Sequence, residues 1–134
     1  MIVLDTSVLI EYYRPSGDSR IRAAVLEAMS AGDIAVNGII QVELLGFAAG
    51  EEERRTLVSD LQAFHFLELG REPFDLACDL GFTLRRGGLT IPATDLVIAA
   101  SAINAQAELF HADGHFDRIA EVSELRARHL ERMN

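Results

Sequence analysis

The chain has 134 residues, a length that supports one domain with a single hydrophobic core. Its apolar fraction of 49% and charged fraction of 25% are typical of globular proteins and exclude an intrinsically disordered chain. The net charge of −9 argues against a broad basic surface for nucleic acid, but it is compatible with a nuclease whose acids bind metal ions.

Other features of the composition bear on the cellular setting. No apolar run reaches the ~18 residues of a transmembrane helix, and no basic region precedes the apolar start, which argues against a signal peptide. The only cysteine, Cys78, cannot form an internal disulfide, and we expect it to be a small core residue. A reducing, cytoplasmic location is therefore expected.

Short apolar runs alternate with longer amphipathic segments along the chain. In chain order, the expected elements are a strand over 2–4, helices over 6–13 and 18–31, a strand over 34–36, a helix from 37 or 38 to about 46 or 50, a helix over 51–64, a strand over 66–69, helices over 73–86 and 92–106, a strand over 109–112 and a helix over 123–133. This alternation predicts an α/β fold with three layers, in which helices flank a short parallel central sheet. Nothing in the sequence divides residues 1–134 into more than one domain.

Four carboxylates lie beside apolar residues at the ends or starts of these elements: Asp5, Glu43, Asp95 and Asp113. Ligands of open parallel sheets bind at the carboxyl ends of the strands, where Asp5 and Asp113 are expected. A buried, ionised carboxylate needs a partner, and few cationic residues lie near these acids in the sequence. Oxygen ligands suit Mg²⁺ or Mn²⁺ better than zinc, and such ions activate water for phosphodiester hydrolysis.

Each acid also has a purely structural interpretation. Asp5 is placed to cap a helix, Asp95 to favour a helix dipole, and Asp113 to form a turn before Gly114. Glu43 is the hardest to explain in this way, because isoleucine, valine and leucine surround it on a predicted helix.

The chain resembles PIN-domain proteins, and among them the VapC-type toxins of bacterial toxin–antitoxin pairs. The matching segments occur in the family's order over nearly the whole chain: 2–10, 41–44, 95–102 and 112–116. The resemblance implies a metal-dependent endoribonuclease that is held inactive by a cognate antitoxin and that forms a homodimer.

The resemblance also implies site residues. The metal ligands and catalytic residues of the family carry over to Asp5, Glu43, Asp95 and Asp113, with Mg²⁺ as the expected ion and Mn²⁺ as a substitute. The hydroxyl that follows the first aspartate in the family carries over to Thr6, which would contact a ligand or the substrate.

The chain departs from the family's pattern at one position. Many relatives carry a second acid immediately before the phenylalanine that follows the fourth aspartate, where this chain has His115. Asp117, one residue past Phe116, is not expected to reach the same point, which leaves the binding of a second metal open. His115 is interpreted as a phosphate contact, a proton-transfer group or an exposed loop residue with no role.

Further residues have two interpretations each. Arg85 and Arg86 either meet RNA phosphates or simply favour the end of a helix dipole. Four phenylalanines are assigned to the core or to a subunit interface: Phe47, Phe64, Phe66 and Phe82. A groove among the first helices would suit an antitoxin helix.

Two other classes of phosphate-handling α/β proteins are excluded because the chain lacks residues that they require. Receiver domains and aspartyl-phosphate hydrolases require a lysine, which this chain lacks, and the hydrolases need an aspartate where Ser7 stands. A non-catalytic PIN-like interaction module and a nuclease acting on DNA remain as alternatives.

Overall fold

Five short parallel strands form the central sheet of the computed structural model, which describes residues 1–133. The strands are β1 (Ile2–Leu4), β2 (Ile34–Asn37), β3 (His65–Leu67), β4 (Glu108–His111) and β5 (Arg126–His129). They lie in the order β3-β2-β1-β4-β5, so β1 is central and both of its neighbours run parallel to it. The three-layer α/β architecture with a parallel sheet is therefore confirmed, with one strand more than predicted.

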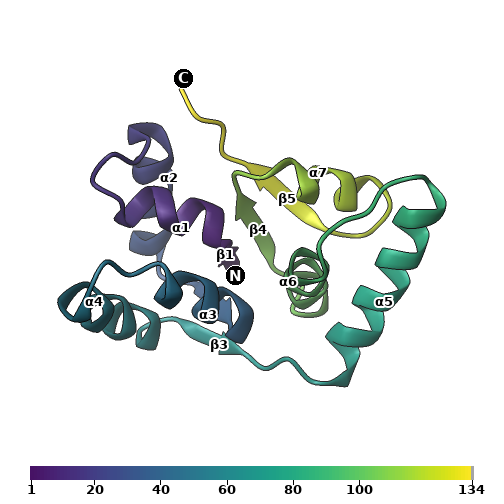
Figure 1. Ribbon diagram of the computed structural model, residues 1–134, viewed down its shortest axis with the longest axis horizontal. Helices are drawn as coiled ribbons and strands as arrows, with labels where there is room; N and C mark the ends of the chain where they lie inside the picture. Colours follow the sequence, from purple (N-terminus) through teal and green to yellow (C-terminus); the bar gives the residue numbers. More distant parts are fainter. Residues whose placement is uncertain (134) are drawn as a thin grey trace.

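Seven helices connect these strands. They are α1 (Thr6–Tyr13), α2 (Ser19–Ala31), α3 (Gly38–Gly46), α4 (Glu51–Gln62), α5 (Arg71–Arg86), α6 (Ala93–Asn104) and α7 (Gly114–Glu121). Figure 1 shows α1 to α4 gathered on one side of the molecule and α5 to α7 on the other. The chain passes from the edge strand β3 through α5 and α6 to β4, on the far side of β1. The strand order consequently reverses between β1 and β4, the point where ligands bind in sheets of this kind.

The hydrophobic core lies between the sheet and these helices. Leu4, Leu9, Ile98, Leu109 and Phe116 are among its largest fully buried side chains. After its first turn, helix α6 is buried on almost all sides from Leu96 to Ala102, as its apolar sequence predicts. Among the described residues, no helix combines the length and the apolar character that crossing a membrane requires.

The C-terminal segment differs from the prediction. The helix expected over 123–133 is wrong, because Arg126–His129 instead form β5, which pairs in parallel with β4. Without this pairing β4 would be an edge strand with unpaired backbone groups. Leu125 and Leu130 are buried on either side of the strand and anchor it to the core. The sequence of β5 is rich in arginine and histidine, so it carries little strand signal of its own.

Helix α7 was also missed by the sequence analysis. Asp113 does not simply form a turn, because its Oδ1 accepts the backbone N–H of His115 at 3.0 Å and so caps α7. Phe116 and Ile119 are fully buried at the i, i+3 spacing that fastens the helix to the core.

Several side chains are exposed that the sequence places in the core or, for the phenylalanines, in the core or a subunit interface. Cys78 is exposed on α5, so the prediction of a small core residue is wrong. Phe47, Phe66 and Phe82 each expose about half or more of their surface, and only Phe64 packs partly buried against the core. Of the two expectations for the exposed phenylalanines, the core is therefore wrong and the subunit interface stays a prediction.

The junction of α1 and α2 holds the C-terminal tail. Glu11 is buried, accepts the Asp18 N–H at 2.9 Å and pairs with Arg132, while Asp18 Oδ2 accepts the Met133 N–H at 2.8 Å. Gly17 sits inside this junction, where a Cβ atom would lie 1.8 Å from the carbonyl oxygen of Glu11. The tight turn therefore excludes any side chain at this position.

We expect Gly17→Ala to lower the free energy of unfolding by about 1–3 kcal/mol, the usual effect of overpacking. Gly46 is the matched control: it lies in α3 with no atom within 4 Å of an added Cβ, so alanine there should be neutral or slightly stabilising. Urea denaturation of both variants measures the difference. Equal stabilities would show that the turn relaxes without cost.

Candidate active site

The candidate site lies at the carboxyl ends of β1 and β4, where the strand order reverses. Asp5 directly follows β1, and Asp113 follows β4 after Ala112. The Asp5 N–H donates to the carbonyl oxygen of Phe110 at 3.0 Å, which ties the two strand ends together. Because β1 and β4 are parallel neighbours, their carboxyl ends meet at one edge of the sheet, and both acids lie there as predicted.

Asp5 combines a capping role with burial. It is only 4% exposed and is the N-cap of α1, and its Oδ2 accepts the Ser7 N–H at 3.0 Å and the Ser7 hydroxyl at 2.5 Å. The Ser7 Oγ in turn accepts the Ala112 N–H at 2.9 Å. Sequence reasoning missed this bridge from β4 to Asp5. A serine two residues after a capping aspartate is the signal that could have indicated it.

Glu43 approaches from α3 and contacts Thr6. The Thr6 hydroxyl donates to Glu43 Oε1 at 2.7 Å, so the residue after the first aspartate orients the second acid. Thr6 is buried and Glu43 is partly exposed, so this contact lies at the border between the core and the surface.

Asp95, Asp113 and His115 form the third part of the site. His115 Nδ1 lies 2.8 Å from Asp95 Oδ2 and 3.4 Å from Asp113 Oδ1. One ligand atom from each of the three residues lies within 4.8 Å of the others. His115 therefore does not lie in a loop: it is in the first turn of α7 and its imidazole contacts two of the acids, while its chemical role stays a prediction.

Burial and neighbouring charges shift the pKa values of two of these acids, Asp5 and Asp95. Burial raises the pKa of Asp5 to about 6, against the pull of its Ser7 hydrogen bonds, and the charges of Asp95 and Glu43 raise it further. Burial also raises the pKa of Asp95; the hydrogen bond from His115 lowers it, and the charges of Asp113 and Glu43 raise it. The four acids thus interact electrostatically through one site.

The donor set fits a divalent cation. Carboxylates gathered at one edge create a region of negative potential, and their oxygens are ligands that Mg²⁺ and Mn²⁺ prefer. The imidazole of His115 adds a nitrogen donor beside Asp95 and Asp113. An ion held here would offset the repulsion that the metal-free site contains.

Asp117 points elsewhere, as predicted. Its Oδ1 lies 3.5 Å from His111 Nε2 and its Oδ2 lies 2.6 Å from His129 Nδ1. His111 is fully buried, and burial lowers its pKa below the ordinary histidine value. The sequence analysis did not identify either histidine, because their proximity depends on the unpredicted strand β5.

Arg85 and Arg86 lie in the last turn of α5, where they favour the helix dipole. The Arg86 guanidinium stacks over the Phe82 ring at 5.5 Å, and within residues 1–133 neither arginine forms an ion pair with the four acids. The contact with RNA phosphate stays a prediction.

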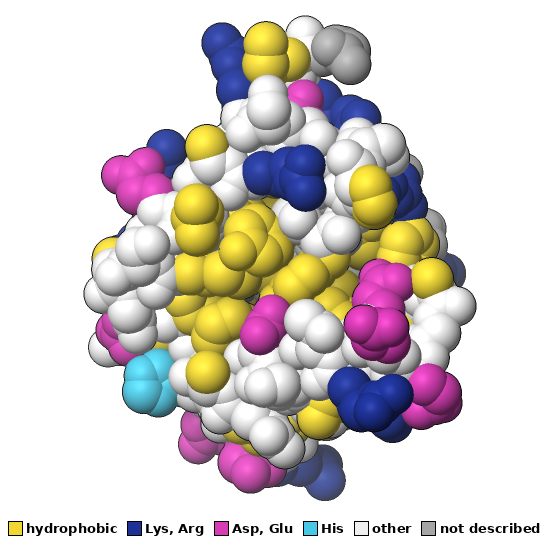
Figure 2. Space-filling view, turned by 90° about the vertical axis from the view of Figure 1, so that its left-hand side faces the viewer, with side chains coloured by type: hydrophobic (Ala, Val, Ile, Leu, Met, Phe, Trp, Pro, Cys, Tyr) yellow, Lys and Arg dark blue, Asp and Glu magenta, His cyan; other side chains and the backbone are white. Residues whose placement is uncertain are grey.

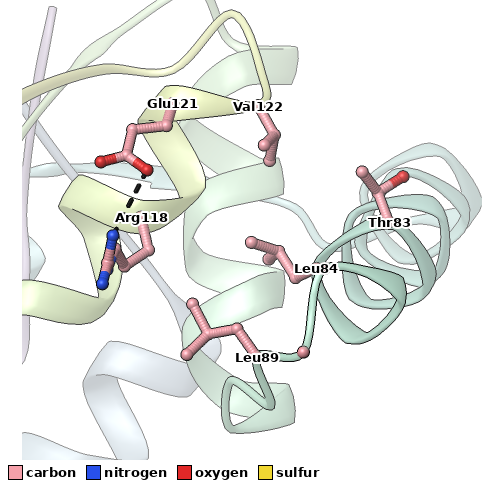
Figure 3. Close-up of a pocket in the computed structure, with 8 residues that line it drawn as sticks. Thr83, Leu84, Leu89, Arg118, Glu121 and Val122 are labelled. Carbon is pink, nitrogen blue, oxygen red and sulfur yellow. Dashed lines mark ion pairs between the residues drawn. The ribbon is translucent and has the colours of Figure 1, made fainter.

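A separate cavity of about 340 Å³ opens beside the end of α5. Figure 3 shows Leu84 and Leu89 facing Val122 across it, with Arg118 and Glu121 joined by an ion pair of 3.6 Å at its side. None of the four acids lines this cavity, so it is distinct from the candidate site.

Comparison with known proteins gives consistent matches. The PIN domain family matches residues 2–122. The chain is 32% identical to ribonuclease VapC11 of Mycobacterium tuberculosis over 130 residues, which cover 95% of this chain and 97% of that protein.

Two solved structures share the fold. VapBC2 from Rickettsia felis bound to a promoter DNA fragment has a TM-score of 0.77 at 22% identity, covering 96% of this chain and 98% of that one. A toxin–antitoxin complex from Klebsiella pneumoniae has a TM-score of 0.69 at 18% identity, covering 85% and 88%.

The raised pKa of Asp5 has a consequence for stability. Because folding raises this pKa from 3.8 to about 6, the ionised form is destabilising: the cost is absent below about pH 4, grows as the pH rises, and is complete above about pH 6. We expect Asp5→Asn, which keeps a capping oxygen, to raise the metal-free free energy of unfolding by about 1–3 kcal/mol near pH 7 and by almost nothing near pH 4.

Urea denaturation in EDTA at both pH values measures this effect. Glu27→Gln, which removes an exposed carboxylate on α2, is the control and should change neither value. An Asp5→Asn protein that is less stable than the wild type near pH 7 would contradict the interpretation, since it would mean that the ionised group is favourably solvated.

Proposed function

This chain belongs to the PIN domain family and, within it, to the VapC ribonucleases, and we propose that it is a metal-dependent endoribonuclease. It hydrolyses phosphodiester bonds of RNA and acts as the toxin of a toxin–antitoxin pair. One observation carries this proposal: the acids gather where the strand order reverses, so that the charges of Asp95 and Glu43 raise the pKa of Asp5, and those of Asp113 and Glu43 raise the pKa of Asp95.

The four acids would hold Mg²⁺, with Mn²⁺ as a substitute. A bound divalent ion lowers the pKa of a coordinated water and stabilises the charge that develops on the leaving oxygen. Ser7 fixes the orientation of Asp5, and Thr6 fixes that of Glu43, so the ligands are held in place before an ion arrives.

His115 and the arginines supply the remaining polar groups. His115 contacts Asp95 through Nδ1 at 2.8 Å and is placed to contact the phosphate of a bound substrate. Arg85 and Arg86 are exposed on the same half of the molecule as α7 (Figure 1). The Arg86 guanidinium lies over Phe82, which leaves Arg85 as the group placed to contact RNA phosphates.

We propose a cognate antitoxin as the protein partner, docked on the side of the first helices. Figure 2 views the molecule from the side of α2 and α4 and shows hydrophobic side chains gathered in a hollow. A cavity of about 200 Å³ lies between α1, α3 and α4, lined in part by Ile10, Tyr13, Leu44, Phe47 and Leu57. The net charge of −9 favours a basic partner, and the similar Klebsiella pneumoniae structure is a toxin–antitoxin complex.

We further propose a homodimer that covers α5. Phe74, Cys78 and Phe82 are all exposed and, being four residues apart, follow one face of this helix. Acids lie along the first part of α5 and arginines end it: the acids are Glu72, Asp75 and Asp79, and the arginines are Arg85 and Arg86. Arg86 continues the face of Phe82, and antiparallel packing of two copies of α5 would bring it toward the other copy's acids, which supports a second copy as the occupant.

The ribonuclease activity is tested by incubating purified, antitoxin-free protein with a mixed pool of structured RNAs. We expect cleavage with Mg²⁺ and with Mn²⁺ and none with EDTA. Asp95→Asn and Asp5→Asn should each reduce the rate by roughly 100-fold or more, because stabilisation by a metal ion is worth several kcal/mol in the transition state. Glu27→Gln should cleave at the wild-type rate, since Glu27 is exposed on α2.

A parallel incubation with single-stranded and duplex DNA separates the alternatives. Preferential cleavage of DNA would replace the ribonuclease with a DNA nuclease. Metal binding without cleavage of either polymer would favour the interaction module. Cleavage that persists in Asp95→Asn and in EDTA would overturn the site assignment.

The dimer is tested by analytical ultracentrifugation of the antitoxin-free chain. We expect a dimer, and we expect Phe82→Glu to convert it to a monomer by placing a charge in the apolar centre of the interface. Leu26→Glu is the matched control, because Leu26 is also a large exposed apolar residue, on α2 and away from α5 (Figure 1). A monomeric wild type, or a dimer that Leu26→Glu breaks and Phe82→Glu does not, would refute the α5 interface.

A further inference from the structure

A second cluster of ligand-type side chains lies behind the acidic site. His111 on β4 and His129 on β5 are register partners, and their rings are 4.8 Å apart between centroids. Asp117 of α7 lies between them, with Oδ1 3.5 Å from His111 Nε2 and Oδ2 2.6 Å from His129 Nδ1. A ligand atom from each residue lies within 4.8 Å of the other two.

His111 supplies an independent observation. Its side chain is 0% exposed, yet its Nε2 has no hydrogen-bond partner within the part of the chain that the structure describes. A buried polar atom without a partner is costly and is therefore rare in folded proteins. The carboxylate of Asp117 is beside this nitrogen, but its Oδ1 lies 3.5 Å away, too far for a good hydrogen bond.

The spacing of the cluster suits a tetrahedral ion. Ligand atoms around zinc lie about 2.0–2.1 Å from the metal, which places neighbouring ligand atoms about 3.3 Å apart in a tetrahedron. The 3.5 Å between His111 and Asp117 is close to this value. The 2.6 Å pair of Asp117 and His129 must open slightly, and both side chains are free to move because they are partly exposed.

We propose that His111, Asp117 and His129 form a second divalent-metal site, separate from the acidic site and suited to Zn²⁺. Two imidazoles and one carboxylate are a common set of three protein ligands for zinc, and water would complete the tetrahedron. Binding through His111 Nε2 places the ring proton on Nδ1 and gives up only a long contact, the Asp113 N–H at 3.3 Å. An ion in this position fastens the edge strand β5 to both β4 and α7.

The site is tested by titrating the full, tag-free chain with Co²⁺, in excess Mg²⁺ that fills the acidic site. We expect one equivalent of Co²⁺ with the visible absorption bands of tetrahedral coordination, and Zn²⁺ should displace it. His129→Ala and Asp117→Asn should each weaken binding by at least ~10-fold. Zn²⁺ should also raise the melting temperature of the wild type and not of His129→Ala.

Two control variants make the result specific. His65→Ala removes an exposed histidine that also pairs with one aspartate, Asp33 at 3.0 Å, but has no third ligand, so it should bind Co²⁺ as the wild type does. Asp95→Asn should likewise keep this equivalent. Circular dichroism of the metal-free variants establishes that they are folded. An equivalent that is lost in Asp95→Asn and kept in His129→Ala, or absent from the wild type, would overturn the proposal.

Discussion

Repulsion among carboxylates gathered at one edge of the sheet is the constraint on which the rest of this structure depends. Asp5 is almost fully buried, and the charges of Glu43 and Asp95 add to the burial that raises its pKa to about 6. Such an arrangement is stable only if each acid is held by a fixed partner. Ser7, Thr6 and His115 serve Asp5, Glu43 and Asp95 in this way, and a divalent cation would remove the remaining cost.

The strand order explains how a short chain holds these groups rigidly. Because β1 is central, Asp5 is anchored by hydrogen-bonded strands on both sides. Its N–H bond to Phe110 and the Ser7 contact to Ala112 then fix its position relative to the end of β4. The site therefore rests on sheet and helix termini, whose positions are set by the core, and needs no long loop.

The sequence predicts those parts of the site that depend on local pattern. Asp5 and Asp113 follow buried strands, and Glu43 and Asp95 lie in apolar helices, so their surroundings are visible in the sequence. Contacts between distant segments are not visible in this way, and the role of His115 and the Ser7 bridge were missed for that reason. The sequence predicted a helix where β5 lies, because the residues of β5 are mostly charged and exposed and so lack the apolar pattern of a strand. The strand forms through backbone pairing with β4. That error concealed the cluster around His111, since His129 reaches it only through β5.

The two clusters have different ligands because of the geometry of α7. His115 and Asp117 are two residues apart, which places them about 200° apart around an α-helix. His115 therefore faces Asp95 and Asp113, while Asp117 faces His111 and His129. His115 consequently adds one nitrogen donor to the oxygen ligands of the acidic site, and Asp117 adds one carboxylate to the two imidazoles of the second cluster. Oxygen-rich sites favour Mg²⁺ or Mn²⁺ and nitrogen-rich sites favour zinc, so one helical turn can keep two cations apart in adjacent sites.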